Sequence, residues 1–201
     1  MDPILETAKE LHSGLIDFVL DAEGDLAVSL EAFSAEHLAN FSQSHQGAVL
    51  QEMVLNMFLT EGTVGDKKPV EMFLESHSDL STQQRDIVNN WQRSFAGLFA
   101  VNRISDDGFE LSNWLTDKQY LVKIDEKEQQ QLKRAKEGEI LLARITPVFE
   151  SYWMFSSPIT LMGRLGKPKL AVAIGNFKDN YKNNLYGDAP ELNEEAWLSV
   201  E

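Results

Sequence analysis

The chain reads NWQRSFAGLFAVNRISDDGFELSNWLTDKQYLVKI over Asn90–Ile124. The spacing of its apolar residues is helical before Gly97 and extended after it. SDDG supplies the residues of a tight turn, in which Gly108 can take a positive φ. Apolar residues alternate with other residues over positions 120–124, as in a strand with one buried face. We therefore predict a β-meander here rather than a catalytic loop.

The β pattern resumes downstream, over residues 139–161, EILLARITPVFESYWMFSSPITL. We expect ILLARITPV to pair with SYWMFSSP across a turn near Phe149 and Glu150. The charged segment 125–138 between the two β regions is read as a short helix or an excursion that ends at Gly138. Four or five strands of this length predict a small antiparallel barrel or strongly curled sheet of the SH3 or OB kind.

The residues before the meander have helical patterns. Asp2 and Pro3 predict the start of a first helix, and Ser81 with Gln84 forms a capping-box pattern before the last one. Residues 25–33 are too few to distinguish a strand from a helix entry. Ser34 is expected to cap a short helix, and residues 47–59 are expected to form a largely buried one.

The fold predicted from these patterns is α+β. A helical N-terminal part is followed by a small antiparallel β barrel-like module and by C-terminal helices. The expected regions are an acidic helical region (1–95), the β module (96–158), and a packing helix with an acidic tail (159–201).

Composition restricts the chemistry. The 201 residues include no cysteine, which excludes disulfides, thiolate metal sites and cysteine nucleophiles. The formal net charge is −14, and residues 1–80 hold fifteen acids against three lysines. Phosphate binding relies on Lys and Arg, so this charge speaks against nucleic-acid binding by the helical region. It permits steering toward a basic partner, and solubility alone is an equally good interpretation.

No motif identifies a reaction. The loop Gly163–Gly166 lacks the outer residues of a phosphate-binding loop, because Leu161 and Pro168 occupy their positions. Four histidines (His12, His37, His45 and His77) have no ligand spacing and are expected to be packing or surface residues. The carboxylates of Asp106, Asp107 and Glu110 belong to a turn rather than to an acid–base pair. We expect no catalytic residue, metal or cofactor.

Five residues are candidates for partner binding. Trp114 and Trp153 are candidates for a semi-exposed aromatic anchor on the barrel. Arg164 and Lys167 lie in a basic loop that could contact an acidic surface, although a solvated connector is the more ordinary interpretation. Trp197 belongs to a short acidic tail that must dock on its own domain or on a partner.

Residues 79–158 also resemble a known layout. SDLSTQQRDIVNNWQRSFAGLFAVNRI, NWLTDKQYLVKI and KEGEILLARITPVFESYWMFSSP are similar to a little-characterised family of cyanobacteria and plant plastids. In this family a helix ending in Trp leads into a small β module. The family itself resembles a plastid factor for assembly of the ATP synthase γ subunit. The resemblance implies an assembly or accessory role without catalysis.

The expected function is that of a non-enzymatic, soluble interaction protein, an assembly chaperone or adaptor with a basic protein client. The alternative is a small nucleic-acid-associated regulatory protein that uses the β module, although the overall charge speaks against it. A third interpretation is an enzyme whose catalytic residues are too dispersed to be recognised in one sequence. No small-molecule substrate is evident. Neither a signal peptide nor a membrane span is recognised, so a cytoplasmic location is expected.

Overall fold

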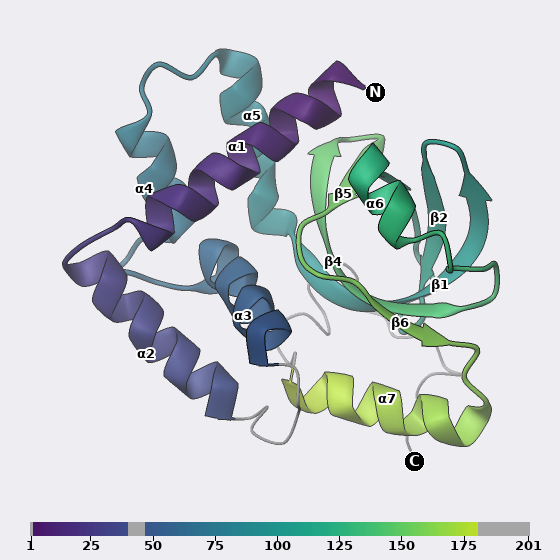
Figure 1. Cartoon of the computed structure of the whole chain (residues 1–201). Coiled ribbons are helices and arrows are strands. Elements are labelled where there is room, and N and C mark those ends of the chain that lie inside the picture. The colour runs from purple at the N-terminus through teal and green to yellow at the C-terminus, as the bar shows by residue number, and fades with distance from the viewer. Residues whose placement is uncertain (1, 40–46, 181–201) are drawn as a thin grey trace. The chain divides into compact units, whose positions relative to one another are not determined.

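A computed structural model describes residues 2–39 and 47–180 of the chain (Figure 1). The described residues form two compact units. The helical unit comprises residues 2–94 together with residues 156–158. The barrel unit comprises residues 95–155 and 159–180.

The helical unit contains five α-helices and one short 3₁₀ helix. They are α1 (Pro3–Leu20), α2 (Asp25–Ala39), α3 (Gly47–Glu61), α4 (Pro69–Ser76), α5 (Thr82–Asn90) and η1 (Trp91–Arg93). Helix α1 begins as the sequence predicts, because the Asp2 side chain accepts a hydrogen bond from the Ile4 N–H and Pro3 occupies the first turn. The predicted capping box of α5 is also present, between Ser81 and Gln84.

Helix α2 differs from the expectation. The ambiguous segment 25–33 and the predicted short helix after it form one continuous helix, so Ser34 lies inside α2 and caps nothing. Its apolar residues are spread around the helix, and Leu26 is its only buried residue. A helix of this kind gives no clear periodic signal in the sequence, which is why its start could not be recognised.

The barrel unit contains six strands and two helices. They are β1 (Phe95–Ser105), β2 (Gly108–Asn113), β3 (Gln119–Lys123), α6 (Glu126–Gln131), β4 (Ile140–Phe149), β5 (Tyr152–Phe155), β6 (Thr160–Gly163) and α7 (Lys167–Asn180). The predicted meander is confirmed as β1–β2–β3, and the predicted pairing of residues 140–149 with the following strand is confirmed as β4–β5.

The first five strands close into a barrel. Strand β1 pairs with β2 on one side and with β4 on the other, which gives the circular order β1–β2–β3–β5–β4–β1. The barrel is mixed rather than wholly antiparallel, because β3 pairs with β5 in parallel. This order, with a helix between β3 and β4, is the connectivity of an OB-fold, one of the two kinds that the sequence predicts. Strand β6 adds to β4.

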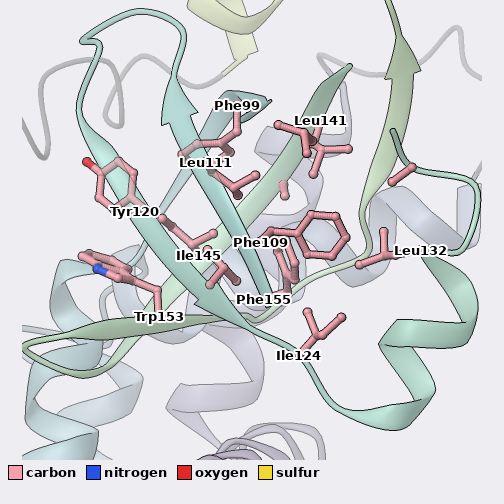
Figure 2. Packing of buried hydrophobic residues seen from close by; sticks show 14 of the residues in the cluster. Phe99, Phe109, Leu111, Tyr120, Ile124, Leu132, Leu141, Ile145, Trp153 and Phe155 are labelled. Atoms are coloured by element: carbon pink, nitrogen blue, oxygen red, sulfur yellow. The ribbon is translucent and has the colours of Figure 1, made fainter. Parts of the chain in front are cut away.

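Aromatic side chains fill the barrel (Figure 2). Tyr120 packs edge-on against Trp153 at 5.3 Å between ring centroids, and Phe95 packs edge-on against Trp153 at 5.7 Å. Leu132, directly after α6, points toward Phe109 and belongs to the same cluster. The residues that follow α6 therefore contribute to the core of the barrel, whereas α6 itself has no buried residue.

The expected helix after the barrel is confirmed as α7 up to Asn180. The predicted acidic tail with Trp197 lies outside the described residues. Among the described helices, none has the length and apolar content needed to cross a membrane.

Candidate functional site

A row of carboxylates runs along the exposed face of α1. Helix α1 buries one face, whose central residues are Leu11 and Leu15. The opposite face carries acids at spacings that return to the same side of a helix. These acids, all exposed, are Glu6, Glu10, Asp17 and, directly after the helix, Asp21. We call these four residues the acidic stripe.

One cation, Lys9, lies on α1 between Glu6 and Glu10, so the four carboxylates of the acidic stripe outnumber the nearby positive charge. Within residues 2–39 and 47–180, none of its four carboxylates forms an ion pair or a side-chain hydrogen bond. The sequence contains ten acids and no Lys or Arg from Glu10 to Asp66. The next cation, Lys67, is held by Glu75 with 2.8 Å between Nζ and Oε2. The hydrogen bond and negative charge of Glu75 raise the pKa of Lys67 above its usual value.

The second candidate surface is the outer face of β1–β2–β3, where OB-folds bind their ligands. Three polar side chains from three strands meet on this face. Asn102 Nδ2 donates to Ser112 Oγ and to Gln119 Oε1, and Gln119 Nε2 donates to Ser112 Oγ at 2.7 Å. Beside them, Arg103 lies 3.8 Å from Glu110 across β1 and β2. The face therefore offers amide and hydroxyl groups and a weak, exposed ion pair.

The composition of this face does not suit phosphate. The β1–β2 connection exposes Asp106 and Asp107, and the β4–β5 connection exposes Glu150. In strands β1–β3, the aromatic side chains are all buried in the core, so the face offers no exposed ring on which a base could stack. Ligand loops with negative charge would repel a nucleic-acid backbone.

At the β1–β2 tip, Asp107 has a structural role. Ser105 Oγ donates to Asp107 Oδ1 at 3.0 Å, and the Ile124 N–H donates to the Asp107 backbone carbonyl at 3.0 Å. Gly108 does not have the positive φ that the turn pattern suggested. Glycine is needed there because a Cβ would lie 2.4 Å from the Val122 carbonyl oxygen.

The two tryptophans predicted as barrel anchors have different environments. Trp153 is a core residue with 7% of its surface exposed, so the expectation of a semi-exposed anchor is wrong for this side chain. The Trp153 ring lies inside the barrel. The sequence could not indicate this, because β5 has apolar residues on both of its faces. Trp114 is half-buried in the β2–β3 connection, and its backbone N–H donates to the Leu98 carbonyl at 2.7 Å.

The remaining predicted residues do not form a joint site. Arg164 Nη2 donates to the Glu137 carbonyl at 3.2 Å, so this guanidinium ties the residues after β6 to the connection between α6 and β4. Lys167 is the first residue of α7, and its side chain is not described. Trp197 lies outside the described ranges.

The described histidines pack on aromatic rings. His37 stacks on Phe33 at 3.9 Å between ring centroids, and its Nδ1 lies 2.8 Å from the Phe33 carbonyl oxygen. His77 makes the same backbone contact with Phe73, and His12 packs edge-on against Trp91. His45 is outside the described residues. In the described ranges, no group of three or more acids or histidines has the geometry to hold a metal ion.

Neither the acidic stripe nor the outer face of β1–β2–β3 was recognised as a candidate surface from the sequence. The acids of α1 entered the prediction only as net charge, although their helical spacing is visible in the sequence. The polar group on the barrel depends on a bulge between Val101 and Arg103, which sets the position of Asn102 and has no sequence signal. Comparison of the chain with known protein families, with curated proteins and with solved structures gave no match.

Proposed function

We propose that the chain is a non-catalytic protein-binding module, an assembly chaperone or adaptor, whose helical unit binds a basic protein client. The observation that carries this proposal is the acidic stripe, four exposed carboxylates with no cation paired to them in the described part of the chain. Between residues 2 and 94 the sequence has sixteen acids and five bases. A surface of one sign steers a partner of the other sign and orients it.

The assembly role is the one implied by the resemblance expected from residues 79–158, and it is proposed here together with a cytoplasmic location. A net charge of this size serves solubility as well. Solubility, however, requires only the charge and not its arrangement in a row. The proposal is therefore tested by removing the same number of charges from two different places, the acidic stripe and exposed sites elsewhere.

Nucleic-acid binding through the barrel is the second candidate, because the OB connectivity favours it. The acidic connections and the absence of exposed rings on strands β1–β3 oppose it. We therefore rank it below protein binding.

The test is a pull-down from native cell extract with the tagged full chain, at low salt and at about 0.5 M salt, where the screening length falls to a few ångströms. One variant neutralises the acidic stripe: Glu6→Gln, Glu10→Gln, Asp17→Asn and Asp21→Asn. A control variant removes the same charge from exposed sites elsewhere: Asp79→Asn, Asp86→Asn, Glu150→Gln and Asp179→Asn.

We expect a stoichiometric protein with a basic surface that is lost at high salt and from the stripe variant but kept by the control. If both variants lost the partner protein equally, binding would depend on the overall negative charge and not on the acidic stripe. Recovery of RNA or DNA, or of no macromolecule, would overturn the proposal in favour of the barrel face or of an unrecognised active site.

A further inference from the structure

The helical unit has an open groove beside α2. The groove has a volume of about 430 Å³, and its walls come from the end of α1, from α2 and from α3. Its lining is mostly apolar and comprises Leu20, Leu30, Ser34, Leu38, Ala48, Gln51, Glu52 and Leu55. This volume is within the range of pockets that bind small-molecule ligands.

Helix α2 forms the wall of the groove whose apolar side chains are not buried against the rest of the protein. Leu30, Ser34 and Leu38 are separated by four residues each, so they form one stripe along the helix. Neither leucine is buried, and Leu20 at the end of α1 is 57% exposed. A row of partly exposed leucines between two helices is the form of a groove that receives the apolar face of another helix.

The surroundings of the groove are acidic. Glu52 is exposed and belongs to the lining itself, and Glu31 follows Leu30 on the outer side of α2. Asp17 and Asp21 of the acidic stripe flank Leu20 in the sequence. Helices α2 and α3 contain no Lys or Arg. An apolar floor inside a field of one sign is complementary to an apolar helix face bordered by cations.

We propose that this groove binds an amphipathic helix of a protein partner, with leucine-like residues on one face and Lys or Arg on either side of them. This inference rests on the proposed function and defines the part of the client that the helical unit contacts. The apolar face fills the groove, and the flanking cations meet Glu52, Glu31 and the acidic stripe.

A defined peptide tests the inference directly. The probe is a leucine–lysine peptide of about 18 residues, five helical turns, with all leucines on one face. One control peptide has the same composition in an order that places no leucines together on a helix. A second control replaces each lysine with glutamate. Binding to the full chain is measured by calorimetry, and helix formation by circular dichroism.

Three variants locate the site on α2. Ser34→Lys places a cation in the groove without removing an apolar side chain, and Leu30→Lys does so with the loss of a leucine. Val28→Lys adds the same charge to the same helix at a residue that is 64% exposed and does not line the groove. Ser34→Lys protects the test against misfolding of Leu30→Lys, and thermal unfolding is recorded for all three.

We expect the ordered leucine–lysine peptide to bind and become helical, and both control peptides to bind at least about tenfold more weakly. Ser34→Lys should weaken binding at least about tenfold, whereas Val28→Lys should weaken it less than about threefold. At about 0.5 M salt the affinity should fall but not vanish, because screening acts on charges and not on apolar burial.

Equal binding of the ordered and scrambled peptides, or equal effects of Ser34→Lys and Val28→Lys, would overturn the groove while leaving an acidic binding surface in place. Absence of binding by the ordered peptide would also overturn it. The proposed function is judged separately, by the pull-down with the stripe variant, so failure of the groove and failure of the function give different results.

Discussion

Gly108 on β2 lies against the backbone of β3 so closely that a Cβ on it would be 2.4 Å from the Val122 carbonyl oxygen. Val122 itself is a fully buried core residue that pairs with Trp153 in the parallel junction between β3 and β5. Close approach, and not a positive φ, therefore determines the residue at the start of β2.

Gly108→Ala should destabilise the barrel unit by about 2 kcal/mol or more, because neither backbone segment can move without disturbing the strand pairing. Urea unfolding followed by near-ultraviolet circular dichroism measures the loss. Gly166→Ala is the control, since a Cβ there meets no atom within 4 Å. Equal stability of the two variants would show that the β2–β3 contact is not as close as described.

Gly14→Ala should stabilise the helical unit by about 0.5–1 kcal/mol. Gly14 is inside α1, where alanine is the better helix former, and its Cβ would lie 3.9 Å from the Phe73 ring, an ordinary contact. Thermal unfolding of the full chain gives the sign. A lower unfolding temperature would mean that α1 and α4 pack more tightly at this point.

Asp125→Ala should destabilise the barrel unit by about 1 kcal/mol. Asp125 caps α6, because its Oδ1 accepts from the Glu128 N–H at 2.8 Å while Glu128 Oε2 accepts from the Asp125 N–H. The loss should appear as faster hydrogen exchange of the amides in and after α6. Lys127→Ala, at an exposed residue of the same helix, should leave exchange nearly unchanged, and a similar effect of both changes would argue against the cap.

Trp153→Ala should cost about 3–5 kcal/mol, the range for a large aromatic removed from a core. Trp114→Ala should cost less, because Trp114 is only half-buried. The two costs, measured by urea unfolding, distinguish a buried core ring from a half-buried one. If Trp153→Ala were the milder change, the position of the Trp153 ring inside the barrel would be wrong.

The sequence was informative where a period repeats over many residues. The apolar face of α1 and the alternation in β3 each indicate which side of the element is buried. Both elements are present in the structure. The order of strands around the barrel could not be predicted, because the parallel pairing of Val122 with Trp153 depends on residues distant in sequence. The exposure of Trp153 could not be predicted either, since β5 is buried on both sides.

The same limit applies to the candidate surfaces. Helix α2 has apolar residues on every side, so its sequence cannot tell which leucines border a groove until α1 and α3 are placed. The acids of α1 are different, because a helix alone fixes which side they share. A search for charge at helical spacing would have found the acidic stripe before the structure was known.

The circular strand order also constrains how the protein folds during synthesis. During synthesis β1, β2 and β3 emerge first and can pair through short connections, but the partners that close the ring, β4 on β1 and β5 on β3, emerge later. Closure of long loops is the slow and entropically costly step in such topologies. Until β4 leaves the ribosome, the nascent meander keeps its apolar side and both outer strand edges uncovered, and the edge of β3 stays uncovered until β5 follows. We expect the chain to be most prone to aggregation in this interval.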